Sequence, residues 1–298
     1  STPCGTLFPY TTLFRSMYKY DGHCRNLTDK QRNKYETKKA PKVVRFKIAE
    51  KTISFKDTVH GSLTFNSNEI DDFIILKSNG MPTYHLAVVA DDADMKITDV
   101  IRGDDHLSNT PKHLLLYQAL NWPIPNYIHL PLILGHDKKR LSKRHGATAI
   151  SEYQEMGILP NAMFNFLSLL GWNPGNDREI MNRGQIINLF SLSKISKSNS
   201  IFDEQKLKWM NGNYIGQMDA EAILNLIHRQ LIEKGLITPD NENKDYLLRV
   251  ISLLKSKIKL IREFADLGVY FFHDPEEFDE KARTKYWKDA DVGERLTQ

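Results

Sequence analysis

The chain has 298 residues, of which 41% are hydrophobic and 26% charged, and its formal net charge is only +4. This is an ordinary globular composition with length for about two domains, and so small a positive charge says little about a nucleic-acid partner. No apolar run of 18 residues occurs, so the sequence predicts no membrane span. Two cysteines in so long a chain exclude a disulfide framework and, without a secretory pattern, predict a cytoplasmic protein.

The first sixteen residues look foreign to the rest of the chain. Residues 6–16, TLFPYTTLFRS, resemble the translation of a sequencing-library adapter in one reading frame. We therefore predict that residues 1–16 are an artefactual segment and that the natural protein begins near Met17. The alternative is an ordinary loop-rich N-terminus, which a continuous genomic reading frame through these codons would support.

A polar helix and several short strands are predicted next. Residues 29–39, DKQRNKYETKK, predict an exposed helix. Short β-like runs follow at 43–48, 52–55 and 62–65. Residues 70–94 then predict a strand, a turn at Asn79-Gly80 and a second strand, because Asn-Gly is a strong hairpin signal.

A strand, a helix and a further strand complete the mixed first half of the chain. Residues 98–102 predict the first strand. In the helix that follows, Asn109 or Thr110 can act as the N-cap, and Pro111 suits the first turn. Residues 128–134, IHLPLIL, predict a buried strand that runs into a basic loop.

The pattern becomes helical in the second half. Helices are predicted at 151–157, 159–172, 202–211, 219–235 and 245–267. Ser151, Pro160 and Asp203 suit the starts of the first three, and the last is expected to end near Gly268. A mixed first half and a helical second half predict a nucleotide-binding part joined to an all-helical part.

The strongest functional signal is the basic loop at residues 138–145, Lys-Lys-Arg-Leu-Ser-Lys-Arg-His. Its cationic groups, with the Ser142 hydroxyl, can close over a polyphosphate and offset the charge on a leaving pyrophosphate. A solvated basic turn and a general patch for RNA phosphates are alternatives that the loop alone leaves open.

Within this loop, residues 140–144, RLSKR, resemble the KMSKS signature of class I aminoacyl-tRNA synthetases, in the KLSKR form of bacterial-type glutamyl-tRNA synthetases. Longer blocks at 82–122, 159–180 and 202–215 resemble the same family. The resemblance is continuous from about residue 18 to 216 and weaker to about 290. It implies an α/β class I synthetase fold, with a partial Rossmann-type nucleotide-binding region followed by an all-α stem-contact and anticodon-binding region.

The resemblance also implies a division of the chain after the foreign segment at 1–16. The C-terminal part of an acceptor-binding insertion is expected at 17–87, the second half of the nucleotide-binding fold at 88–137, a stem-contact region with the signature loop at 138–220, and the start of the anticodon-binding region at 221–298.

By the resemblance, three catalytic residues lie in the signature loop. Lys143 corresponds to the lysine that contacts the ATP phosphates, and Ser142 adds a hydroxyl donor. Arg140 stands where the family usually has lysine. This change keeps the charge and alters the geometry, so closure over ATP is expected to be slower.

Other residues correspond to positions that bind ATP outside the loop. His106 falls where the family places a ring near ATP, and Leu132 and Ile133 lie on the strand whose backbone would recognise adenine. Together with Lys143, they make up the expected ATP site.

Glutamate binding is expected from Arg102 and Tyr84. Arg102 matches the arginine that receives the substrate's side-chain carboxylate, for which a guanidinium fork is well suited, and this contact would discriminate glutamate from glutamine. Tyr84 matches a tyrosine that hydrogen-bonds the amino acid. The alternatives are a salt bridge from Arg102 to Asp104 or Asp105, and a buried core position for Tyr84.

No fixed metal site is predicted. The sequence contains an acidic cluster of Asp91, Asp92, Asp94, Asp104 and Asp105, which we interpret as organising the site. Magnesium is expected to arrive with ATP. Some relatives bind zinc near Cys24, but a lone cysteine with His23 beside it cannot complete a tetrahedral site, so no zinc is predicted.

The HIGH motif of class I synthetases does not occur in the sequence, since His129 and His136 bracket LPLILG without its spacing. We expect the motif to lie upstream, so that this chain is a fragment of a glutamate–tRNA ligase with half an ATP site and without activity of its own. Expected partners are ATP, glutamate and tRNA(Glu), and the resemblance suggests a monomer. A paralogue that glutamylates a queuosine base of tRNA and a non-catalytic RNA-binding remnant are the alternatives.

Overall fold

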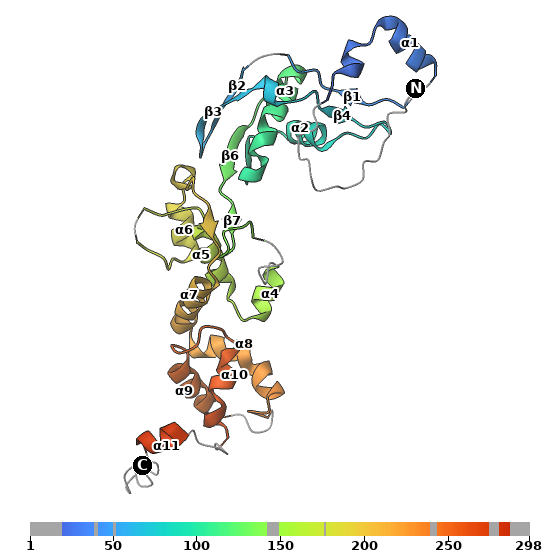
Figure 1. Cartoon of the computed structure of the whole chain (residues 1–298). Helices are drawn as coiled ribbons and strands as arrows, with labels where there is room; N and C mark the ends of the chain where they lie inside the picture. Colours follow the sequence, from blue (N-terminus) through green and yellow to red (C-terminus); the bar gives the residue numbers. More distant parts are fainter. Residues whose placement is uncertain are drawn as a thin grey trace. The chain divides into compact units, whose positions relative to one another are not determined.

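The computed structural model describes residues 20–38, 41–49, 52–141, 149–175, 177–238, 243–273 and 280–286. The chain forms two compact units that divide between Pro131 and Leu132 (Figure 1). Within the described residues, no helix has the length and apolar character needed to span a membrane.

The first unit begins with an exposed helix, α1 (Asp29–Thr37), preceded by a 3-10 turn at His23–Asn26. The Thr28 hydroxyl accepts a hydrogen bond from the Gln31 N–H, and the Gln31 side chain accepts one from the Thr28 N–H. This capping box satisfies two backbone donors that would otherwise lack partners. No residue of α1 is buried, which confirms the predicted exposed helix.

The short β-like runs form two antiparallel pairs. β1 (Val44–Arg45) pairs with β4 (Ile74–Leu76). β2 (Thr52–Asp57) and β3 (Gly61–Asn66) form a hairpin in which Asp57 lies opposite Gly61. Gly61 has a φ of +83°, a conformation that costs glycine little, so the chain can reverse there. The predicted strands of this region are confirmed.

A βαβ unit joins this hairpin to a larger sheet. β5 (Asp99–Gly103) leads through α3 (Thr110–Leu120) to the parallel strand β6 (Asn126–Leu130). β2 meets β6 where Asp57 lies opposite Tyr127, so the sheet has the order β3-β2-β6-β5. Parallel strands linked by a helix are the α/β arrangement expected from the sequence.

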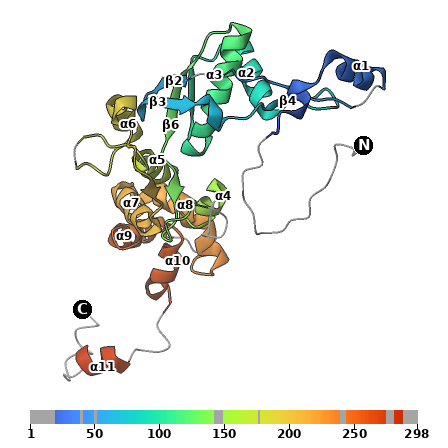
Figure 2. The same cartoon turned by 45° about the horizontal axis from the view of Figure 1, so that its top comes forward.

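The second strand predicted within residues 70–94 is wrong. The turn is present, since Gly80 has a φ of +81° and the Met81 N–H donates to the Asn79 side chain. The chain then forms helix α2 (Tyr84–Asp94), which lies beside α3 (Figure 2). The packing of Leu86, Val89 and Ala93 against the core of the unit outweighs the preference of Val88 and Val89 for a β-strand.

Two further expectations for this unit need correction. Asn109 occupies the N-cap position of α3, but neither its side chain nor that of Thr110 caps the helix, because both are bonded to groups around Arg102. Pro111 does lie in the first turn, as predicted. The buried strand expected at 128–134 is interrupted at Pro131, which lacks the N–H needed to continue a ladder.

The second unit starts with a short parallel pair, β7 (Ile133–Leu134) and β8 (Ser200–Ile201). Its first helices are α4 (Ile150–Glu155), α5 (Pro160–Leu169), α6 (Arg183–Leu189) and α7 (Glu204–Gln217). Asp203 caps α7 by accepting from the Gln205 and Lys206 N–H groups, as predicted. Ser151 does not cap α4, which begins one residue earlier, and Glu152 instead accepts from the Ala149 N–H.

Three helices share the last large core: α8 (Ala220–Glu233), α9 (Lys244–Leu254) and α10 (Glu263–Leu267), with α11 (Glu280–Tyr286) following (Figure 1). The single helix predicted at 245–267 is wrong, because the chain leaves the helical path after Leu254. Asn211 bonds the Lys259 carbonyl, and the Glu263 carboxylate accepts from the N–H groups of Lys259 and Leu260. These bonds stabilise a break that local periodicity does not reveal.

Candidate active site

Tyr84, Arg102 and His106 lie together in the first unit. Tyr84 is the first residue of α2, Arg102 lies near the end of β5, and His106 belongs to the 3-10 turn Asp104–Asn109 that follows. The Tyr84 hydroxyl is 3.5 Å from His106 Nδ1, and an Arg102 N–H donates to the His106 carbonyl at 3.3 Å. Tyr84 is 50% exposed, so it is not the buried core tyrosine of the alternative interpretation.

The guanidinium group of Arg102 is bonded mainly to uncharged acceptors. Its Nε donates to His129 Nε2 at 3.1 Å, and one Nη1 N–H donates to His113 Nδ1 at 3.3 Å. Its Nη2 donates to the Thr110 hydroxyl at 2.7 Å as well as to the His106 carbonyl. These four bonds use four of the five N–H groups that a guanidinium carries.

These bonds replace the salt bridge to Asp104 or Asp105 considered as an alternative for Arg102. Asp104 instead pairs with His60 Nε2 at 2.7 Å. The carboxylate of Asp105 lies 4.0 Å from His106 Nε2. A two-pronged contact with a substrate carboxylate would require Arg102 to release one of its present partners, since one N–H is left over.

The histidine nitrogens that contact Arg102 carry no proton. A guanidinium only donates, so His129 Nε2 and His113 Nδ1 accept. The proton of His113 then lies on Nε2, where it is donated to His85 Nδ1 at 3.1 Å. Burial, with the nearby charge of Arg102, lowers the pKa of His113 to about 3. Burial, with Lys112 and Arg102, lowers the pKa of His85 to about 4.

Asp57 and His129 form a fully buried pair behind Arg102. Asp57 Oδ2 accepts from His129 Nδ1 at 2.7 Å, and neither side chain is exposed. The second carboxylate oxygen accepts from the N–H groups of Val59 and His60, both at 2.9 Å. These bonds to its charged form hold the pKa of Asp57 below its usual value, against the opposing effect of burial.

Asp92 of the acidic cluster is partly buried. Burial raises the pKa of Asp92, and the positive charge of Arg102 partly offsets this effect. Among the residues that the structure describes, no three His, Cys, Asp or Glu side chains are grouped so as to hold a metal ion. Cys24 is exposed, with its thiol free of any disulfide.

The expected ATP-binding strand lies in the second unit. The Leu132 N–H donates to the Asn199 side chain at 2.9 Å, and the Leu132 carbonyl accepts from the Ser200 N–H at 3.1 Å. The Ile133 carbonyl accepts from the Leu141 N–H at 3.0 Å. Arg140 is exposed next to this strand, whereas Ser142 and Lys143 lie outside the described residues.

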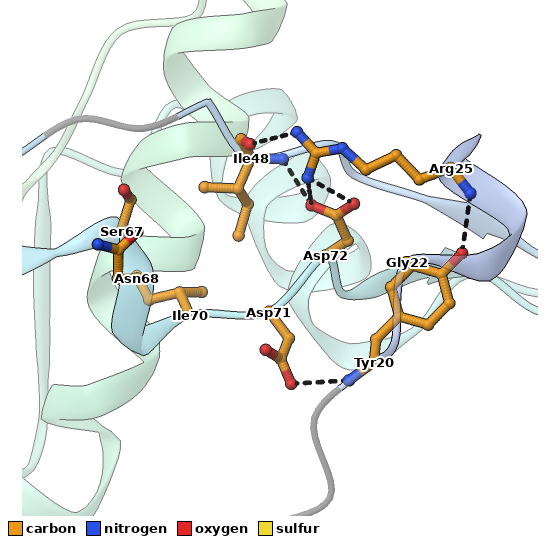
Figure 3. Close-up of a pocket in the computed structure, with 9 residues that line it drawn as sticks. All are labelled: Tyr20, Gly22, Arg25, Ile48, Ser67, Asn68, Ile70, Asp71 and Asp72. Atoms are coloured by element: carbon orange, nitrogen blue, oxygen red, sulfur yellow. Dashed lines mark hydrogen bonds and ion pairs between the residues drawn. The ribbon is translucent and has the colours of Figure 1, made fainter.

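A separate cavity of about 300 Å³ lies near the start of the first unit (Figure 3). Arg25 reaches across it to both oxygens of Asp72 at 3.1 Å, and the Ile48 N–H donates to the same carboxylate at 2.8 Å. These contacts tie the 3-10 turn at His23–Asn26 to the residues before β4. None of the predicted site residues lines the cavity, so it is a structural feature distinct from the candidate site.

Comparison with known families identifies the type of protein. The family described as "tRNA synthetases class I (E and Q), catalytic domain" matches residues 12–209. This chain belongs to the class I tRNA synthetases. A second family, "Anticodon binding domain", matches residues 220–298 of the synthetase chain. The fold is therefore a class I synthetase catalytic domain followed by a helical anticodon-binding domain, which confirms the fold class predicted from the sequence.

Similar proteins carry the name glutamate–tRNA ligase. The synthetase chain is 44% identical over 282 residues to "Glutamate--tRNA ligase 2" of Koribacter versatilis, covering 94% of this chain and 58% of that protein. It is 42% identical to the "Glutamate--tRNA ligase" of Pelobacter propionicus, covering 94% of this chain and 59% of that protein. The chain thus spans less than two thirds of the length of these relatives.

A solved structure gives the same match at the level of the fold. The glutamate tRNA ligase of Elizabethkingia meningosepticum, in complex with its amino acid, superimposes with a TM-score of 0.83 at 34% identity. The match covers 94% of the synthetase chain and 60% of the solved chain.

The groups that surround Arg102 in this synthetase were not predictable from its local sequence. Asp57, Thr110, His113 and His129 are all at most 1% exposed, yet none of them was predicted to contact Arg102. The available signal was a histidine inside an apolar run, as in PKHLLLY and YIHLPL, where a buried polar side chain needs a partner. The pairing of His129 with Asp57 crosses 72 residues of sequence and has no local signature.

Proposed function

We propose that the protein is a glutamate–tRNA ligase, which activates glutamate as glutamyl-adenylate and transfers it to tRNA(Glu). Class I tRNA synthetases use ATP as a substrate, generally with Mg²⁺. The observation that carries this proposal is the placement of Arg102 beside Tyr84 and His106 in a chain of this family. A guanidinium at this position would receive the side-chain carboxylate of glutamate, which glutamine lacks.

The reaction needs no protein nucleophile. An oxygen of the glutamate α-carboxylate attacks the α-phosphorus of ATP, and pyrophosphate leaves. The terminal ribose hydroxyl of the tRNA then attacks the acyl carbon of the adenylate, gives up its proton, and AMP leaves. Positioning and charge stabilisation supply the rate. Within this scheme Tyr84 and Arg102 hold glutamate, while His106 lies near ATP.

The signature loop has the second role in this scheme. Lys143, Arg140 and Ser142 would stabilise the phosphate charge as pyrophosphate leaves, and the backbone at Leu132 and Ile133 would recognise adenine. Because the Leu132 N–H already bonds Asn199, adenine binding would compete with that bond or use the neighbouring backbone groups. The expected division into regions at 17–87, 88–137, 138–220 and 221–298 belongs to the same proposal.

The match to an anticodon-binding family over residues 220–298 favours this function over the queuosine-modifying paralogue, which stops soon after the signature loop. Transfer of labelled glutamate or glutamine to tRNA, by the protein expressed from its complete genomic reading frame, tests the proposal. Arg102→Ala is expected to abolish the preference for glutamate, whereas Arg32→Ala on the exposed helix α1 serves as the matched control. Absence of charging by the wild-type protein would favour the RNA-binding remnant instead.

A further inference from the structure

The side chain of Arg102 is held from three directions by groups that lie deeper in the protein. His129 accepts from Nε, Thr110 accepts from Nη2, and His113 accepts from Nη1. Thr110 and His129 are 0% exposed and His113 is 1% exposed, whereas Arg102 is only partly buried. The guanidinium therefore stands at the outer edge of a buried polar network.

The network is anchored to the backbone of the sheet. The Asp57 carboxylate accepts from the backbone N–H groups of Val59, His60 and His129 as well as from His129 Nδ1. Asp57 also lies at the residue pair that joins β2 to β6. A carboxylate fixed by this many bonds holds the His129 ring in one tautomer, with Nε2 as the acceptor that faces Arg102.

The bonds also fix the direction of each proton. His129 carries its proton on Nδ1, which donates to Asp57, so Nε2 is free to accept from Arg102. Thr110 Oγ1 lies 3.2 Å from the same Nε2 and accepts from Arg102, so the single lone pair of Nε2 is shared between the Arg102 N–H and the Thr110 hydroxyl. Four of the five guanidinium N–H groups are then occupied, and among the described residues one Nη1 N–H has no bonded acceptor.

We propose that His129 and Thr110 are positioning residues that orient the guanidinium of Arg102, and that Asp57 holds His129 in the tautomer whose Nε2 accepts. The remaining Nη1 N–H of Arg102 then receives the side-chain carboxylate of glutamate. This inference rests on the proposed function. It assigns part of the discrimination between glutamate and glutamine to buried residues that do not touch the substrate. The alternative is a purely structural role, in which the network only provides hydrogen-bond partners for buried polar groups of the core.

Two substitutions at one position separate these roles. His129→Gln places an amide oxygen where Nε2 lies and keeps an acceptor for Arg102, but it loses the donor to Asp57. His129→Asn places an N–H where Nδ1 lies and keeps the bond to Asp57, but it leaves Arg102 Nε without its acceptor. A purely structural role predicts that the two variants have similar effects, because each breaks one hydrogen bond of the same buried polar network.

The assay measures KM for glutamate and for ATP in the protein expressed from its complete genomic reading frame. His129→Asn is expected to raise KM for glutamate about tenfold or more, as the loss of one charge-assisted bond would. KM for ATP should stay unchanged, and His129→Gln should remain within about threefold of the wild type. Equal changes in both KM values, or equal effects of the two variants, would overturn the proposal.

A second readout does not depend on activity. In the ¹⁵N-arginine-labelled chain, the Arg102 Nε–H is expected to exchange slowly with water in the wild type and in His129→Gln, and rapidly in His129→Asn. If neither histidine variant folds, Thr110→Val and Thr110→Ser give the same comparison, because only serine keeps the acceptor for Nη2. Slow exchange in the wild type without any glutamate-dependent reaction would reject the proposed function alone. Rapid exchange in the wild type would reject the positioning role itself.

Discussion

His85 Nδ1 lies 3.1 Å from His113 Nε2, and this contact places two neutral histidines side by side next to Arg102. Lys112 and Arg102 both disfavour a positive charge on this pair. Because the folded protein disfavours protonation of these two histidines, the stability of the first unit is expected to depend on pH.

Acidification from pH 7 to 4.5 is expected to destabilise the first unit. The folded-state pKa values of about 4 for His85 and about 3 for His113 lie below the ordinary value of 6.5, so the unfolded chain binds more protons throughout this window. Stability should fall as the pH falls, by up to about 5 kcal/mol for the pair.

Urea unfolding followed through a fluorine label on Trp122, the one tryptophan before residue 132, measures this dependence. The double variant His85→Gln, His113→Gln should have a shallower slope of unfolding free energy against pH, whatever its absolute stability. An unchanged slope would show that these histidines do not titrate as their surroundings indicate.

Asn211→Ala is expected to destabilise the second unit by about 1–3 kcal/mol, because it removes three hydrogen bonds from a buried side chain to the backbone. The Asn211 side chain is 0% exposed; its oxygen accepts from the Leu159 N–H, and its amide donates to the carbonyls of Gly157 and Lys259. Asn213→Ala is the matched control on the same helix, since its side chain bonds only the Trp209 carbonyl of its own turn.

Thermal unfolding of both variants measures the difference. The Asn213 variant should remain within about 0.5 kcal/mol of the wild type, as an exposed substitution would. Similar losses in the two variants would contradict the view that Asn211 holds the break between α9 and α10 in place.

Gly157→Ala is expected to cost at least about 1–3 kcal/mol, because two effects act together. Gly157 has a φ of +88°, which side chains rarely adopt, and an added Cβ would lie 3.0 Å from the Ile261 N atom. Gly216→Ala in α7 is the opposite case, since its Cβ would meet no heavy atom of the described residues within 4 Å. This variant should gain about 0.5–1 kcal/mol in unfolding free energy. Denaturant titration measures both variants, and the prediction is contradicted unless their unfolding free energies shift in opposite directions from the wild type.

Elements with a strong local signal were predictable from the sequence. The capped helix α1, the short strands, Pro160 and the Asp203 cap depend on residues that are close together in the chain. Helix α2 was missed because its valines favour a strand locally, and only the packing of Leu86 and Val89 against the core decides otherwise. The break after α9 was missed because Asn211, which stabilises it, lies 48 residues from Lys259.

The candidate site shows the same limit. Tyr84, Arg102 and His106 lie within 23 residues of sequence and belong to one recognisable block. The Asp57–His129 contact joins a hairpin to a strand 72 residues later, so only the folded sheet brings the two together. The bonds that Arg102 makes to histidines rather than to Asp104 likewise depend on that sheet.

ATP–pyrophosphate exchange measures whether the protein activates glutamate. The protein is expressed from its complete genomic reading frame and assayed with glutamate and tRNA, beside Lys143→Ala and its same-loop control Lys139→Ala. We predict glutamate-dependent exchange that falls about 10²–10³-fold in Lys143→Ala, as for loss of one preorganised charge-stabilising group, and only slightly in Lys139→Ala. No exchange by the wild type, or equal losses in the two variants, would contradict the account and indicate a general RNA-phosphate patch.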